Sequence, residues 1–192
     1  DRLQIEATLL KGISVSEQFY PEEHFRPMAD VDVLIPEQAL SRVESVLLDE
    51  GFIRVEFPPI DGLHHGAPLR HAQRDTIVEL HRSLFPNDSA LCSGTVFNPA
   101  QVARRSVAST YHGRPVARLS PELQLVYIAA SWFNDLTHHK VQPGFLATLF
   151  DAVYLLAATG GTLDWSRLLQ SLDNEMARAS LRSLCGVNFP RP

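Results

Sequence analysis

A short apolar segment that carries two acids constrains this chain more than any other feature. The segment is Asp30–Ile35, and prolines stand near both of its ends. Its alternation predicts a strand with Asp30, Asp32 and Leu34 on one face and with Val31, Val33 and Ile35 on the other. At about 3.3 Å per residue, the two acidic residues lie roughly 6.5–7 Å apart, so both side chains can reach one divalent ion or a pair. A soluble edge strand is the alternative interpretation.

A second apolar strand with an acid in its middle is predicted at Thr76–His81. Val78 and Leu80 share one face, whereas Ile77, Glu79 and His81 share the other. A carboxylate is seldom left in such a place without a partner. If this strand lies beside the first, Glu79 joins Asp30 and Asp32, and a metal ion is then needed to neutralise three carboxylates.

The start of the chain suggests a phosphate-binding turn. Residues 5–10 predict a short strand, although a helix fits almost as well, and Lys11-Gly12 follows. A short helix at 13–20 would point its N-terminal amides back toward the strand end. A glycine after a strand more often marks an ordinary turn than a phosphate-binding site. Farther on, Arg26 can pair with a carboxylate or a phosphate near the start of the acidic strand, or be an ordinary surface arginine.

The next segments predict a helix from Pro36 to Gly51 and a strand at 52–57. A loop at 61–68 contains His64 and His65, and together with His71 these suggest zinc. Neither a cysteine nor a third spaced ligand supports that interpretation, so a solvated or substrate-facing loop is favoured.

Residues 90–118 predict irregular structure with a short helix around 99–106. From Ser120 the pattern changes to helices, the first capped by Ser120 and a later one by Asp164. We therefore predict two domains, an N-terminal domain at 1–118 that carries the acidic strands and a helical domain at 119–192.

Composition is that of an ordinary globular protein of 192 residues. The sequence contains no apolar run of about eighteen residues, and its first residues do not resemble a signal peptide, so we expect a soluble, cytoplasmic protein. Cys92 and Cys185 lie far apart and lack the spacing of a zinc or redox motif.

The charge is unevenly distributed. The net charge of −5 argues against a protein that binds long nucleic acid. Residues 1–50 hold eleven acids and four basic residues, whereas residues 70–118 hold three acids and seven arginines. An acidic, metal-binding part opposite a basic part suits a small polyanion such as a nucleoside triphosphate, and two solvated faces are the alternative.

These motifs resemble a known family. Lys11-Gly12, then Arg26 to Ile35, then Val78-Glu79-Leu80-His81 are similar to the uncharacterised nucleotidyltransferase family of the polymerase-β-like superfamily. The resemblance implies an α+β fold, in which an N-terminal mixed sheet with flanking helices precedes a helical C-terminal region. It also implies a magnesium-dependent transfer of a nucleoside monophosphate from a nucleoside triphosphate, ATP by default, to an acceptor hydroxyl.

The resemblance assigns roles to individual residues. Asp30, Asp32 and Glu79 would hold two magnesium ions about 3.5–4 Å apart, and Glu79 would also accept the proton of the attacking hydroxyl. The triphosphate would contact Lys11, Gly12, Ser14 and Arg26. His81 would orient the acceptor or a neighbouring carboxylate.

One departure leaves alternatives open. The superfamily commonly has Gly-Ser or Gly-Gly at the phosphate turn, whereas this chain has Lys11-Gly12-Ile13-Ser14. A nucleotide-binding adaptor or sensor that lost turnover is therefore a second hypothesis. A His-Asp phosphohydrolase is a third, weakened because the sequence contains no His-Asp dipeptide. The acceptor is a small molecule or a protein, and the sequence does not identify it. Nor does the sequence indicate which base the donor nucleotide carries.

Overall fold

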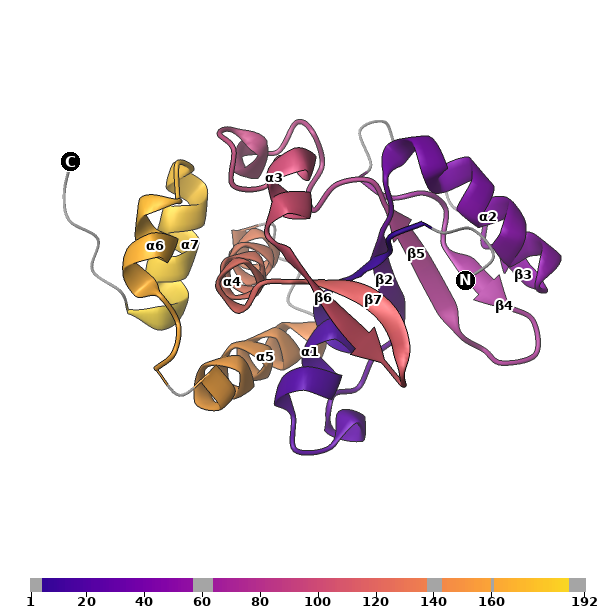
Figure 1. Cartoon of the computed structure of the whole chain (residues 1–192), viewed down its shortest axis with the longest axis horizontal. Helices are drawn as coiled ribbons and strands as arrows, with labels where there is room; N and C mark the ends of the chain where they lie inside the picture. The colour runs from indigo at the N-terminus through magenta and orange to yellow at the C-terminus, as the bar shows by residue number, and fades with distance from the viewer. Residues whose placement is uncertain (1–4, 57–63, 138–142, 160, 187–192) are drawn as a thin grey trace.

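The computed structural model describes residues 5–56, 64–137, 143–159 and 161–186. Within these ranges the strands form one seven-stranded mixed sheet in the order β3-β4-β5-β2-β1-β7-β6. Figure 1 shows α2 at one end of the molecule and α4, α5, α6 and α7 gathered at the other. The strands are β1 (Thr8–Leu9), β2 (Val31–Leu34), β3 (Phe52–Arg54), β4 (Leu69–His71), β5 (Ile77–His81), β6 (Ser106–Tyr111) and β7 (Arg114–Leu119). The helices are α1 (Lys11–Phe19), α2 (Leu40–Asp49), α3 (Pro99–Arg104), α4 (Pro121–Thr137), α5 (Pro143–Thr159), α6 (Trp165–Gln170) and α7 (Glu175–Cys185), with 3-10 turns at Glu23–Phe25, Glu37–Ala39 and Ala90–Cys92.

The two faces of the central strands have different partners. Ile35, Leu69 and Leu80 form a core cluster against which Val33 of β2 and Val43 of α2 pack. Since side chains alternate along a strand, Asp32 and Glu79 are directed to the opposite face. The alternation in the sequence thus predicted which face of each strand carries the acids.

A second, larger core joins the helices to the start of the chain. Its fully buried members include Val15 of α1, Leu123 of α4, Leu155 of α5 and Leu181 of α7. Helix α4 packs against both α5 and α7, and α1 packs against α5. One hydrophobic core therefore contains residues from both sides of position 118, and the division into two domains there stays a prediction.

The predicted α+β fold is confirmed, with differences in extent. Residues 5–10 contribute only the short β1, and α1 begins at Lys11, two residues earlier than expected. Helix α2 and strand β5 lie where the sequence predicted them, and Asp164 caps α6 through a bond from the Arg167 amide. Part of the strand expected at 52–57 and part of the loop expected at 61–68 lie outside the described residues.

The prediction of irregular structure at 106–118 was wrong. These residues form the hairpin of β6 and β7, and β7 continues the sheet by pairing in parallel with β1. Its turn uses His112 and Gly113, with φ angles of 45° and 74° that suit a tight two-residue hairpin turn. Pro115 and the charged Arg118 obscured the strand pattern. Arg118 is fully buried, and its guanidinium donates to the carbonyl oxygens of Ser14 and Thr110.

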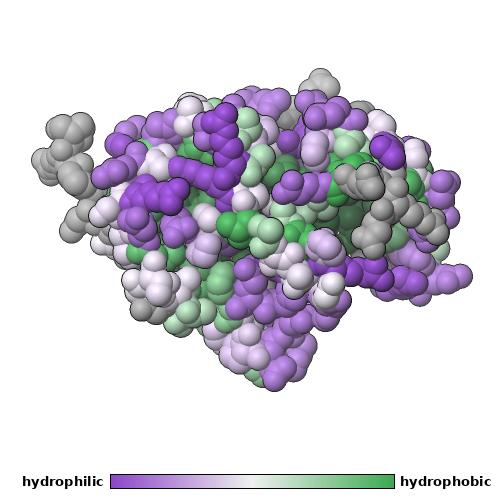
Figure 2. All heavy atoms as spheres, viewed as in Figure 1, coloured by the Kyte–Doolittle hydropathy of each residue, from purple (hydrophilic) through white to green (hydrophobic). Residues whose placement is uncertain are grey.

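The surface view in Figure 2 shows hydrophilic side chains interspersed with smaller hydrophobic patches. None of the helices in the described part of the chain is both long enough and apolar enough to cross a membrane.

Candidate functional site

Two parallel strands bring the acidic side chains together. β2 pairs in parallel with β5, with Asp32 opposite Glu79 and Leu34 opposite His81. Ligand atoms of Asp32, Glu79 and His81 all lie within 4.8 Å of one another. The sequence predicted the two strands and their polar faces, and the structure adds that they are direct neighbours.

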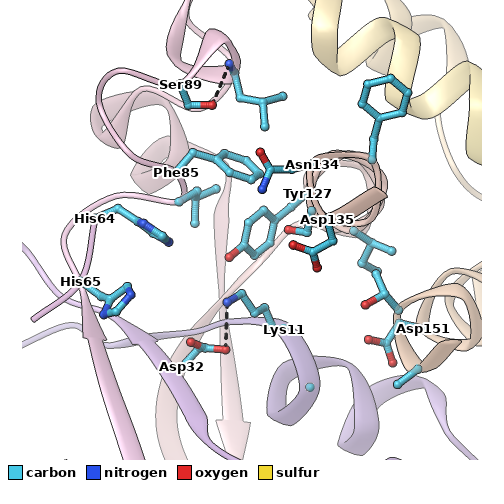
Figure 3. A pocket seen from close by; sticks show the side chains of 18 of the residues that line it. Lys11, Asp32, His64, His65, Phe85, Ser89, Tyr127, Asn134, Asp135 and Asp151 are labelled. Carbon is cyan, nitrogen blue, oxygen red and sulfur yellow. Dashed lines mark hydrogen bonds and ion pairs between the residues drawn. The ribbon is translucent and has the colours of Figure 1, made fainter. Parts of the chain in front are cut away.

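Asp32 is the buried centre of this cluster, with 4% of its surface exposed. His81 Nε2 lies 2.5 Å from Asp32 Oδ1, and Lys11 Nζ lies 3.4 Å from Asp32 Oδ2 (Figure 3). Burial by itself raises the pKa of Asp32, but the hydrogen bond from His81 and the charge of Lys11 outweigh it and hold the pKa below its ordinary value. Asp32 is therefore ionised at neutral pH.

Asp30 lies beside the acidic cluster, and its role as a metal ligand stays a prediction. It precedes β2, is half-buried, and lies outside the group of Asp32, Glu79 and His81 among the described residues. It nevertheless lines the same cavity. Burial and the neighbouring charge of Asp32 raise the pKa of Asp30. Like charges so close together favour a cation at this place.

The beginning of α1, which follows β1 directly, presents Lys11 to the acids. Lys11 has a φ of 45°, a conformation that is strained for a residue other than glycine and that is often found at functional sites. Burial alone would lower the pKa of Lys11, but Tyr127 and the carboxylates of Asp32, Asp30 and Glu79 raise it above its ordinary value. Lys11 is thus held as a cation beside the acidic cluster.

Gly12 permits a close approach. A Cβ atom at this position would lie 2.9 Å from Met28 Cγ and 3.4 Å from Arg26 Cζ. The predicted strand and helix are both present, but Lys11 and Gly12 are the first two residues of α1 and do not form a separate turn before it. The glycine therefore brings the segment before β2 against the beginning of α1.

Arg26 binds a carboxylate, which is one of the three alternatives that the sequence left open. Its Nε and Nη2 donate to the two oxygens of Asp151 on α5, at 2.9 and 3.0 Å. The hydroxyl of Tyr20 donates to the same carboxylate at 2.7 Å. Arg26 and Asp151 both line the cavity, so this ion pair joins the segment before β2 to the helical region at the site itself.

Ser14 does not line the cavity. It is fully buried, its hydroxyl accepts a bond from Gln18, and its carbonyl oxygen accepts one from Arg118. Helix α1 begins three residues before Ser14 and directs this residue toward β7. The predicted contact of Ser14 with a phosphate is untested, and this placement speaks against it.

The histidines divide into two groups. The rings of His64 and His65 lie 5.1 and 5.2 Å from that of His81, whereas His71 packs against Phe52 on another part of the sheet. The Nδ1 atom of His71 accepts hydrogen bonds from the backbone amides of Gln73 and Arg74. His71 is therefore held in a local turn and does not belong to the group of histidines around His81. Burial and the neighbouring His81 lower the pKa of His64 to about 3, so His64 is neutral at physiological pH.

A large cavity opens between these elements. Its volume is about 1290 Å³, and its walls come from α1, the segment before β2, the loop that follows β5, and helices α4 and α5. The sequence analysis missed Gln124, Tyr127 and Asp151, which also line it. The available signal was that each places a polar group within an otherwise apolar helical stretch.

Comparisons with known proteins found a matching family model and similar solved structures. A family model described as "Uncharacterised nucleotidyltransferase" matches residues 1–187. No curated protein matches the sequence. The crystal structure of ANT(2")-Ia in complex with adenylyl-2"-tobramycin is 15% identical, with a TM-score of 0.56 over 95% of this chain and 90% of that one. An antigenic nucleotidyltransferase-like protein from Paracoccidioides brasiliensis is 17% identical, with a TM-score of 0.61 over 97% of this chain and 82% of that one. At these identities the likeness shows a shared fold.

Proposed function

The chain belongs to the uncharacterised nucleotidyltransferase family, and from this premise we propose that it transfers a nucleoside monophosphate to the hydroxyl of an acceptor. The donor is a nucleoside triphosphate, ATP by default, and pyrophosphate leaves. The observation that supports this proposal best is the direct pairing of Glu79 with Asp32, which lines a cavity together with Lys11.

The donor atoms of the site fit a divalent cation. Two carboxylates and one imidazole nitrogen lie within 4.8 Å of one another, and Asp30 adds a third carboxylate at the same cavity. Carboxylate oxygens are the ligands that Mg²⁺ prefers. Asp30, Asp32 and Glu79 would hold the ions, and His81 would orient Asp32 through its short hydrogen bond. Bound Mg²⁺ supplies positive charge that stabilises the phosphoryl oxygens during transfer.

The protein's own residues perform the remaining tasks. Lys11, held as a cation, binds the triphosphate together with the backbone of Gly12 at the start of α1, which also lines the cavity. The acceptor oxygen forms a bond to the α-phosphorus while the bond from that phosphorus to the oxygen bridging to the β-phosphate breaks. Glu79 takes the proton of the acceptor hydroxyl, and the electron pair of the broken bond leaves with pyrophosphate.

The cavity has room for two reactants. Its volume of about 1290 Å³ exceeds the roughly 300–1,000 Å³ of common small-ligand sites. A nucleotide and a small acceptor therefore fit together, and a side chain of another protein could enter in place of the small acceptor. The complex of the structurally similar ANT(2")-Ia with adenylyl-2"-tobramycin supports an acceptor of small-molecule size.

The proposal is tested by calorimetric titration of the protein with ATP. We expect binding that requires Mg²⁺ and that is abolished in Asp32→Asn. The matched control is Asp49→Asn, which changes an exposed acid at the end of α2. Absence of ATP binding by the wild-type protein in the presence of Mg²⁺ would refute the proposal.

An adaptor or sensor without turnover is the second candidate. The observation that favours it is that both carboxylate oxygens of Asp32 already have protein partners, His81 and Lys11. That hypothesis predicts ATP binding as tight as an enzyme's, with no labelled product under any acceptor.

A further inference from the structure

Gln124 of α4 is a buried amide without an evident partner. Only 1% of its surface is exposed, yet neither Nε2 nor Oε1 has a hydrogen-bond partner among the residues that the structure describes. A buried donor and acceptor left unpaired cost free energy, so such a pair in a native protein needs an explanation, and a bound ligand is one. Gln124 also lines the cavity.

The surroundings of Gln124 are apolar and aromatic. Tyr127 and Ile128 lie three and four residues farther along α4, on the same face as Gln124. The ring of Phe85 approaches that of Tyr127 with a centroid distance of 5.4 Å. All four side chains are buried and line the cavity, and we call them the amide recess: Phe85, Gln124, Tyr127 and Ile128.

The amide recess adjoins the place proposed for the triphosphate. Figure 3 shows the hydroxyl end of Tyr127 directed toward Lys11, and Lys11 in turn contacts Asp32. Gln124 lies one helical turn from Tyr127, about 4.5 Å along the axis of α4. A molecule whose phosphates reach Lys11 can therefore place its other end against the recess.

We propose that the amide recess binds the nucleobase of the donor nucleotide and that Gln124 pairs with the edge of the base. The proposal rests on the proposed function and adds to it the residue that recognises the base. A carboxamide presents one donor and one acceptor side by side, and glutamine makes such a two-bond contact with adenine. The aromatic rings of Phe85 and Tyr127, which meet edge to face at an interplanar angle of 74°, offer apolar surface against which a planar base can pack.

The experiment compares two ligands on two proteins by calorimetry, in the presence of Mg²⁺. MgATP carries a base, whereas magnesium tripolyphosphate carries only the phosphates. In Gln124→Met, a variant of similar size without the amide, we expect ATP to bind roughly 5- to 150-fold more weakly and tripolyphosphate to bind as in wild type. Gln170→Met, at an exposed position of α6, is the matched control and should bind both ligands normally.

A ligand series on the wild-type protein removes any dependence on the folding of the variant. Ribose 5-triphosphate, which lacks the base, should bind more weakly than ATP by a similar factor. Equal affinity for ATP and ribose 5-triphosphate would overturn the proposal, and so would unchanged ATP affinity in a folded Gln124→Met. The hydrogen-bond partner of Gln124 would then be a buried water or the acceptor. Tripolyphosphate and ATP both failing to bind wild type would instead overturn the proposed function, and the base site with it.

Discussion

Replacing Arg26 by methionine should destabilise the protein strongly, because it leaves a buried carboxylate without its cation. Asp151 is 2% exposed, and Arg26 donates to both of its oxygens. Removing one partner of a buried pair typically costs about 3–5 kcal/mol. Tyr20 still donates to Asp151 in the variant, and the Arg26 side chain is 12% exposed, so we expect the lower end of the range, about 3 kcal/mol.

Urea unfolding at pH 7, followed by circular dichroism, measures this loss directly. For a chain of this size, 3 kcal/mol corresponds to a fall in Tm of about 6–12 °C. The control is Arg54→Met, since Arg54 pairs with Glu44 at the surface and is 60% exposed, and its loss should leave stability nearly unchanged.

A double-mutant cycle separates the ion pair from other effects of the substitution. Combining Arg26→Met with Asp151→Leu removes both charges, so the double variant should be more stable than the sum of the single losses predicts. An Arg26→Met protein within about 1 kcal/mol of wild type, or strict additivity in the cycle, would show that this pair does not hold α5 against the segment before β2.

Three further predictions concern other buried groups. Arg118→Met should cost about 3 kcal/mol in urea unfolding, because it leaves Glu17 and the carbonyl oxygens of Ser14 and Thr110 without their buried donor, and a change below about 1 kcal/mol would contradict this. The pKa of Asp32 is lower in the folded protein than its ordinary value of 3.8. The ionised carboxylate therefore contributes its full stabilisation above pH 3.8, and this contribution is lost as the pH falls through the pKa of the folded state. Asp32→Asn should flatten the acid side of the curve of unfolding free energy against pH, and an unchanged curve would refute this assignment. Burial raises the pKa of Cys185 to about 11, so only about a thousandth of this residue is thiolate at pH 8. Iodoacetamide should therefore label Cys185 far more slowly in the folded protein than in urea. Equal labelling rates in the two conditions would contradict this prediction.

The sequence predicted those features of the site that depend on local alternation. Alternating side chains along β2 and β5 assigned Asp32 and Glu79 to polar faces, and the pairing of these strands confirmed that they are neighbours. Asp30 shows the limit of that reasoning, because β2 begins one residue after it and it lies outside the group that Asp32, Glu79 and His81 form among the described residues.

Contacts between distant parts of the chain could not be predicted in this way. Arg26 and Asp151 are 125 residues apart, and only the packing of α5 against α1 makes them partners. Gln124 looked like one more residue of a core helix, since its isolation from hydrogen-bond partners depends on the shape of the cavity. The hairpin at 106–119 was missed because its buried arginine is satisfied by contacts that no local pattern shows.

The most direct test of nucleotidyl transfer is to follow label from ATP carrying ³²P at the α-phosphate. The protein is incubated with Mg²⁺ and a pool of hydroxyl-bearing small molecules and proteins, and labelled products are separated from ATP. We expect labelled acceptor and an equal amount of pyrophosphate with wild type and with Asp49→Asn, and neither product with Asp32→Asn or Glu79→Gln. Label transfer that survives in Asp32→Asn would contradict the assignment of the site, and ATP binding without any transfer would favour the adaptor.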